Sequence, residues 1–245
     1  MSVDGAGELV LFLHGIRGNR RNWAGQLAFF SRRFQAAAWD VRGYGDSDDY
    51  DGPLQFDLHL TGDVLRVAEH FKAAKLHLVG LSMGGRIARN FALRYPERLH
   101  SLTLISSTPG FDALSAEGVK RFVNERRSST PQSLQHLLGS KASRAAYEEL
   151  LDSVARIHPA SYQKTLEASV AQDRAAPIEK INVPTLVIAG EEDTVYPPEL
   201  ARKMARRIPG AKLVMFELTG HLANLEQPER FNQVVLEFLT SQEKR

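Results

Sequence analysis

A glycine-rich segment that contains one serine is the part of this sequence best suited to chemistry. It reads GLSMGG over residues 80–85, directly after the apolar run 76–79 and directly before a helix-like stretch. In so tight a turn between a strand and a helix, a Cβ at Gly80 or Gly84 would collide with the opposing backbone. The following helix directs its free N–H groups and positive dipole end toward the same point. The pattern therefore predicts that Ser82 is a nucleophile, with stabilisation for the negative charge of an attacked carbonyl.

A serine nucleophile needs a base to take its proton and an acid to orient that base. Asp193 follows the apolar run 185–189, and His221 follows the apolar run 212–216. Because the carboxyl ends of parallel strands meet at one edge of an open sheet, both side chains are expected near Ser82. Two other carboxylates remain open as the acid, namely Glu192 and Asp112.

Several motifs resemble those of the α/β-hydrolase superfamily, and the resemblance covers nearly the whole chain. Beside the turn at 80–85 they are LHG at 13–15, DVRGYGDS at 40–47 and GHLANLEQPERF at 220–231. The resemblance implies a catalytic triad of Ser82, Asp193 and His221. It also implies that the backbone N–H groups of Ile16 and Met83 form the oxyanion hole, and that no cofactor or metal takes part.

Within the superfamily, the segments 80–85 and 221–228 look most like those of 3-oxoadipate enol-lactonases, which open a small lactone carrying carboxylates. Carbon–carbon bond hydrolases of aromatic degradation usually have Asn before the serine and Trp after the histidine, where this chain has Leu81 and Leu222. The resemblance therefore implies a serine hydrolase of a small carboxylic ester or lactone. Carbon–carbon bond hydrolysis, perhydrolysis and acyl transfer stay open, as does a slow-turnover ligand receptor or signalling module.

Arginine and phenylalanine side chains are candidates for substrate contacts. Arg17 follows Ile16, and Arg86 lies one turn into the expected helix, so either could approach a bound carboxylate. A structural role is the alternative for each of these arginines. An apolar pocket could be lined by Phe111, Phe122 and Leu134. An anionic substrate could instead be favoured by Arg121, Arg126, Arg127 and Arg174.

Alternating strand-like and helix-like runs predict a parallel sheet with helices on both faces. The resemblance implies that this sheet belongs to an α/β-hydrolase fold, which is doubly wound and mostly parallel. Strands are expected at 9–13, 34–39, 76–79, 102–105, 185–189 and 212–216. Helices are expected at 23–32, 58–71, 82–95, 198–207 and 228–239. Helical patterns without a strand-like run predict a small cap at 111–176, inserted in a core of 1–110 and 177–245. Only eight residues precede Leu9, so the family's N-terminal hairpin should be reduced or absent.

Composition is consistent with a globular enzyme of this kind. The chain has 245 residues and a formal net charge of +2, with basic and acidic residues interspersed, which argues against a nucleic-acid surface. It contains no cysteine, which excludes disulfides, thiolate metal sites and a cysteine nucleophile. There is neither a signal-peptide pattern nor an apolar run of membrane-spanning length. We expect a cytoplasmic protein with a small-molecule ester or lactone substrate and no membrane partner; the oligomeric state stays open.

Overall fold

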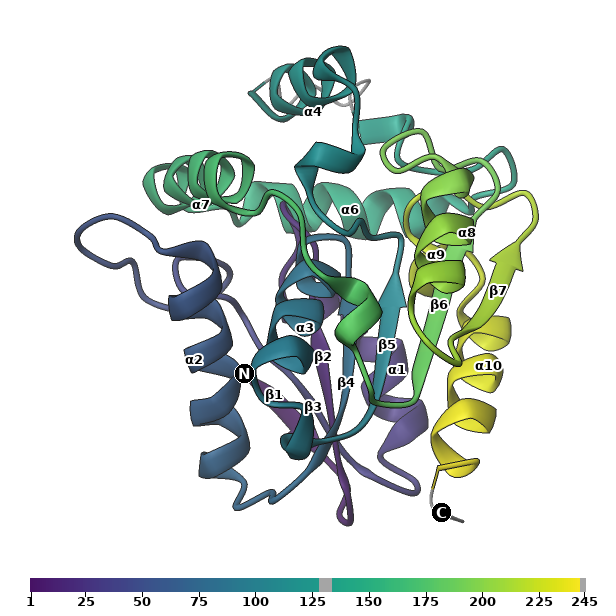
Figure 1. Ribbon diagram of the computed structural model, residues 1–245. Helices are drawn as coiled ribbons and strands as arrows, with labels where there is room; N and C mark the ends of the chain where they lie inside the picture. Colours follow the sequence, from purple (N-terminus) through teal and green to yellow (C-terminus); the bar gives the residue numbers. More distant parts are fainter. Residues whose placement is uncertain (128–133, 243–245) are drawn as a thin grey trace.

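The computed structural model describes residues 1–127 and 134–242, apart from the side chain of Arg127, and a seven-stranded sheet lies at its centre (Figure 1). The strands are β1 (Ser2–Asp4), β2 (Leu9–Leu13), β3 (Gln35–Ala38), β4 (Leu76–Leu81), β5 (Leu99–Ile105), β6 (Thr185–Gly190) and β7 (Lys212–Phe216). Their order across the sheet is β1-β3-β2-β4-β5-β6-β7. All neighbouring pairs are parallel except β1 with β3, so the predicted fold class is confirmed.

The central strands are buried on both faces. Every residue of β2, β4 and β6 is buried, as expected for parallel strands that are covered by helices on both sides. This burial explains why continuous apolar runs located these strands in the sequence. The strand β5 begins three residues earlier than expected, directly after the short 3-10 helix η2 (Pro96–Arg98).

The N-terminal hairpin of the family is reduced to one short strand. Three residues of β1 pair antiparallel with β3, from Ser2 opposite Ala38 to Asp4 opposite Ala36. The chain then returns to β2 through Gly5, whose φ of 78° is readily adopted only by a residue without a side chain. The six remaining strands form the parallel part of the sheet, as the sequence predicted.

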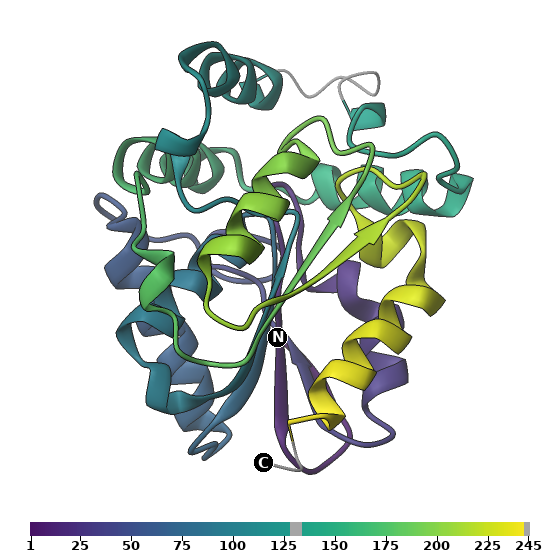
Figure 2. The same cartoon turned by 45° about the vertical axis from the view of Figure 1, so that its right-hand side comes forward.

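Helices cover both faces of the sheet. Their bounds are η1 (Arg20–Trp23), α1 (Ala24–Phe30), α2 (Phe56–His70), α3 (Met83–Arg94), α8 (Pro198–Arg207), α9 (Ala223–Glu226) and α10 (Pro228–Thr240). In Figure 2, α2 and α3 lie on one side of the sheet, and α1 and α10 lie on the other. The predicted doubly wound arrangement is therefore present.

Between β5 and β6 the chain forms a group of helices above the carboxyl ends of the strands (Figure 1). They are η3 (Phe111–Ala113), α4 (Ala116–Arg127), α6 (Arg144–Ala155) and α7 (Pro159–Gln172). The chain then descends beside the sheet through the short 3-10 helix η4 (Ile178–Lys180) to β6 (Figure 1). The described part of the predicted cap, 111–176, contains no strand. Treating this insertion as a separate cap, with the remainder as the core, stays a prediction.

Candidate active site

Ser82 lies in the turn between β4 and α3 in an uncommon backbone conformation. Its φ is 54° and its ψ is −110°, a region that residues with a side chain rarely adopt. The turn is closely packed, because a Cβ on Gly80 would collide with the carbonyl of Gly84, and a Cβ on Gly84 with the carbonyl of Leu13. The requirement for glycine at both positions is therefore confirmed. The Ser82 N–H donates to the Ile105 carbonyl over 2.8 Å, which anchors the turn to β5.

Both expected oxyanion donors lie close to Ser82 in the chain or in the fold. Met83 is the first residue of α3, where backbone N–H groups have no acceptor within the helix. Ile16 belongs to the loop after β2 and lines the same pocket as Ser82. The Ser82 side chain makes no capping hydrogen bond to α3. The start of α3 is therefore suited to stabilise negative charge beside the serine.

His14 holds the loop that carries Ile16. Its Nε2 accepts from the Val41 N–H over 3.0 Å, and its Nδ1 lies 2.8 Å from the Gly15 carbonyl. This arrangement requires a neutral ring with its proton on Nδ1. Burial lowers the pKa of His14, which favours the same neutral form.

Asp193 and His221 form a buried pair. His221 Nδ1 lies 2.8 Å from Asp193 Oδ2, and the other carboxylate oxygen accepts from the N–H groups of Val195 and Tyr196 over 2.8 and 3.0 Å. With both oxygens held, Asp193 fixes the ring and leaves His221 Nε2 available as a base. The other two carboxylates have different partners, since Glu192 accepts from Ser140 and Asp112 pairs with Arg174.

Glu226 braces the loop that presents His221. Its carboxylate accepts from the N–H groups of Gly220 and Leu222, each over 3.0 Å, and from the N–H of Gly139 over 2.6 Å. The His221 N–H donates to the Leu137 carbonyl over 2.7 Å. The histidine loop is thereby tied to the helical insertion, which sequence patterns did not indicate.

Ser82 and His221 line a common pocket with a free volume of about 30 Å³. This is far less than the several hundred Å³ of typical small-molecule sites, so a substrate can enter only if the surrounding side chains move apart. The remaining lining residues are Gly15, Ile16, Arg17, Gly18, Asn22, Leu81, Arg126, Leu137, Leu150, Leu222 and Leu225. The walls are thus mainly apolar, with two arginines among the polar exceptions.

The predicted substrate-contact residues divide into one that lines this pocket and three that do not. Arg17 lines it and donates to the Tyr162 hydroxyl over 3.1 Å and to the Glu125 carbonyl over 2.7 Å. Arg86, Phe111 and Phe122 are buried elsewhere, so the structure does not place them in contact with a ligand at Ser82.

Arg86 instead has a structural environment. Its Nη1 lies 3.0 Å from Asp173 Oδ2, and its guanidinium lies 5.0 Å from the centre of the Phe56 ring and 4.7 Å from that of Phe111. Phe111 in turn packs edge to face on Phe122, with ring centroids 4.9 Å apart. These residues join α3, the helix that follows Ser82, to the helical insertion between β5 and β6. The alternative prediction, that Arg86 has a structural role, fits this position.

The other candidate substrate-contact residues of the helical insertion also differ in whether they line this pocket. Leu134 is buried but is not a lining residue of the pocket, and Arg121 and Arg174 are exposed. Arg126 lines the pocket, while the side chain of Arg127 lies outside the described residues. A helical pattern alone could not reveal which of these side chains faces the serine.

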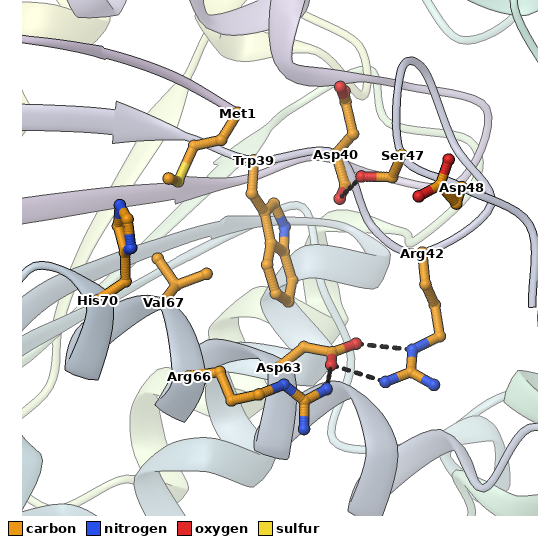
Figure 3. A pocket seen from close by; sticks show the side chains of 10 residues that line it. All are labelled: Met1, Trp39, Asp40, Arg42, Ser47, Asp48, Asp63, Arg66, Val67 and His70. Carbon is orange, nitrogen blue, oxygen red and sulfur yellow. Dashed lines mark hydrogen bonds and ion pairs between the residues drawn. The ribbon is translucent and has the colours of Figure 1, made fainter.

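A wider pocket lies between the N-terminus, the loop after β3 and α2 (Figure 3). Three of its charged side chains are paired with one another, since Arg42 donates to both oxygens of Asp63 over 2.7 and 2.6 Å, and Arg66 also binds Asp63. Ser47 donates to the Asp40 carbonyl over 2.8 Å. The described residues that line this pocket therefore offer no serine with a histidine base.

Two further properties concern the described ranges as a whole. Within 1–127 and 134–242, no helix combines the length and the apolar character needed to cross a bilayer. The same ranges contain no group of three or more His, Asp or Glu side chains placed to hold a metal ion.

Comparison with known proteins agrees with this geometry. The alpha/beta hydrolase fold family matches residues 8–228. A curated relative, the 2-hydroxy-6-oxononadienedioate/2-hydroxy-6-oxononatrienedioate hydrolase of Paraburkholderia phymatum, is 32% identical, over 96% of this chain and 88% of that protein.

Solved structures with the same fold include two named hydrolases. The enol-lactonase from Burkholderia xenovorans has a TM-score of 0.86 and 26% identity, over 98% of this chain and 95% of that one. A thermophilic esterase from Thermogutta terrifontis, solved with malate bound, has a TM-score of 0.84 and 28% identity, over 98% and 92% of the two chains. The chain therefore belongs to the α/β hydrolase fold family, and the prediction that it is a hydrolase enzyme is confirmed.

Proposed function

We propose that this protein is a serine hydrolase of a small carboxylic ester or lactone, with Ser82 as nucleophile, His221 as base and Asp193 as the acid that orients it. The observation that carries the proposal is the buried pair of His221 and Asp193, 2.8 Å apart, in which His221 lines the same pocket as Ser82. Nucleophile, base and orienting acid are the three groups that acyl transfer to a serine requires.

The proposed reaction has two halves. Ser82 Oγ attacks the substrate carbonyl while His221 Nε2 takes the hydroxyl proton, and the N–H groups of Met83 and Ile16 stabilise the oxyanion. His221 then gives its proton to the leaving oxygen, which leaves an acyl group on Ser82. Water, activated by His221, releases the acid and restores the serine. In a lactone the leaving oxygen stays attached to the acyl group, so one product is formed.

The two solved neighbours support this reaction class, because one is named an enol-lactonase and the other an esterase, each above 25% identity. The similarity of both structures to this chain extends over almost its whole length, including the turn at Ser82 and the helical insertion. Neither name identifies the acyl group that fits the pocket at Ser82.

Carbon–carbon bond hydrolysis is the second candidate, and the curated relative with 32% identity favours it. Against it, Leu81 and Leu222 replace the Asn and Trp that such enzymes usually carry beside the serine and the histidine. Both leucines line the pocket, so this difference lies where substrate binds. Parallel assays with 2-hydroxy-6-oxononadienedioate and with a simple aliphatic lactone would separate the candidates by which substrate disappears.

The proposal is tested by following nitrophenol release from a short-chain p-nitrophenyl ester with the parent protein and with Ser82→Ala. We expect turnover in the parent and its loss in the variant. Ser47→Ala is the matched control, since Ser47 lines the other pocket and should be dispensable. Absence of turnover from a folded parent on an ester and lactone panel would contradict the proposal and favour a ligand receptor. Persistence of turnover in Ser82→Ala would reject the nucleophile.

A further inference from the structure

Arg126 presents an unusual charge to the pocket at Ser82. It comes from α4 in the insertion, is only 4% exposed, and lines the pocket together with Ser82 and His221. Its Nη1 donates to the Phe122 carbonyl over 3.2 Å, and its guanidinium lies 3.6 Å from the centre of the Phe122 ring. Its Nε is buried without a hydrogen-bond partner among the described residues. These contacts hold the side chain in place without neutralising it.

The nearest described carboxylate does not satisfy Arg126. Glu125 Oε2 lies 3.9 Å from Arg126 Nη1, beyond hydrogen-bond distance. The same carboxylate is closer to His136, at 3.3 Å, and also faces Arg121 at 4.0 Å. One half-buried carboxylate is thus shared between two arginines and the ring of His136, whose pKa is lowered by burial. The described lining of the pocket contains two arginines and no Asp or Glu.

Such an arrangement is costly for folding. A buried charge without a close counter-ion loses hydration that the protein does not replace. Burial lowers the pKa of Arg126 to about 10, and the neighbouring charge of Arg17 acts in the same direction. The guanidinium nevertheless keeps its charge at neutral pH. Costs of this kind are typical of binding sites, where the missing partner is supplied by the ligand.

We propose that Arg126 binds a carboxylate carried by the substrate, so that the preferred substrates are esters or lactones with a free carboxylate a short chain away from the scissile carbonyl. This inference rests on the proposed function for the identity of the reacting bond. The planar guanidinium matches a carboxylate in shape, and the enclosed site excludes the water that would weaken the pairing. Most of the other side chains that line the pocket are apolar, which suits the chain between the two ends.

The first test uses two esters with acyl chains of equal length, monoethyl glutarate and ethyl valerate, followed by acid release. We expect the parent to prefer the anionic ester and Arg126→Gln to lose about 10–100-fold in kcat/KM on it, as expected for a lost charged hydrogen bond. The kcat/KM for the neutral ester should change by less than about threefold. Equal losses on both esters would overturn the proposal.

Matched variants separate binding from folding. Arg121→Gln removes a charge from the same helix, but its side chain is 57% exposed and does not line the pocket, so both activities should stay near the parent's. Arg126→Lys keeps the positive charge but loses the planar guanidinium, so the variant should retain part of the preference for the anionic ester. A binding role would be contradicted if folded Arg126→Lys lost activity on both esters to the same extent as Arg126→Gln.

The second test does not need turnover. In Ser82→Ala, calorimetry should detect glutarate binding more tightly than valerate, and adding Arg126→Gln should remove the difference. If the parent hydrolyses neither ester yet glutarate binds through Arg126, the proposed reaction fails and the carboxylate site stands. If esters are hydrolysed but glutarate binds no better than valerate, the carboxylate site fails alone. Inorganic phosphate binding as tightly as glutarate would also overturn the assignment to a carboxylate.

Discussion

Two groups of buried charged residues lie where the helical insertion meets the rest of the molecule, and their surroundings differ. The junction cluster joins α3 to the end of α7 and consists of Arg86, Arg89 and Asp173. The pocket cluster consists of Arg126 and His221, which line the cavity at Ser82, and of Asp193, which binds His221. In the junction cluster, one carboxylate binds both arginines. In the pocket cluster, Asp193 is fully bonded, whereas Arg126 has no carboxylate within hydrogen-bond distance among the described residues.

This difference separates charge that holds the fold from charge that serves a ligand. Arg86 has two nitrogens without acceptors among the described residues, yet the Asp173 carboxylate is 3.0 Å from its Nη1, and two aromatic rings lie within 5.0 Å of its guanidinium. Arg126 faces the cavity with one ring beneath it. We therefore expect changes in the junction cluster to affect stability and changes in the pocket cluster to affect turnover.

The largest effect is expected from Asp193→Asn, which should lower kcat by about 10⁴-fold because the His221 ring loses the group that fixes its tautomer. Urea unfolding should show a far smaller proportional change. Glu192→Gln, one residue away, should keep kcat near the parent's, since Glu192 binds Ser140 instead. Near-normal turnover in Asp193→Asn would contradict the role of Asp193 in orienting His221.

Asp173→Asn should cost about 3–5 kcal/mol of unfolding free energy, because it leaves two buried guanidiniums without their carboxylate. The measurement is urea unfolding monitored by tryptophan fluorescence. Asp112→Asn is the control, since its pair with Arg174 is exposed and should contribute about 1 kcal/mol or less. A loss no larger than that of the control would break the distinction between the clusters.

Arg126→Met should raise the unfolding free energy by about 1–2 kcal/mol while it removes carboxylate binding. The reason is that the buried charge is not neutralised by the protein, and methionine fills a similar space. Thermal unfolding gives the sign directly. A clear loss of stability would mean that Arg126 is a structural residue of the same kind as Arg86.

The smallest expected effect is on pH dependence. Because burial lowers the pKa of His14 in the folded protein, the unfolded chain binds a proton more readily as pH falls below about 6.5. The unfolding free energy should therefore be constant above that pH. It should decrease as the pH is lowered from there to the folded-state pKa of His14, by at most about 1.4 kcal/mol per pH unit. Unfolding between pH 5 and 8 should show a shallower slope in His14→Gln than in the parent. An unchanged slope would contradict this assignment.

Much of the fold was predictable because its determinants are local. Continuous apolar runs marked the parallel strands, and the glycines at 80 and 84 marked the turn that exposes Ser82. The order of motifs along the chain also pointed to the loops of Asp193 and His221, which the structure places in contact. The strand β1 was missed because three residues with mixed polarity give no pattern.

The arginines could not be sorted from the sequence, because their partners are distant in the chain. Arg86 meets Asp173 across 87 positions, and no local pattern connects the two. Whether Arg126, rather than its neighbour Arg121, faces Ser82 depends on how α4 rests on the core. Phe111 and Phe122 were expected in the pocket but pack on each other and on Arg86 or Arg126, since aromatic faces cover those cations.

The central claim is that Ser82 is a nucleophile activated by His221 and Asp193. Its most direct test is to treat the protein with a p-nitrophenyl alkylphosphonate, which leaves a stable phosphonyl group on an attacking serine, and to locate that group by peptide mass spectrometry. We predict one modification, on Ser82, formed far more slowly in Asp193→Asn. Modification of another residue, or none in a folded protein, would contradict the account.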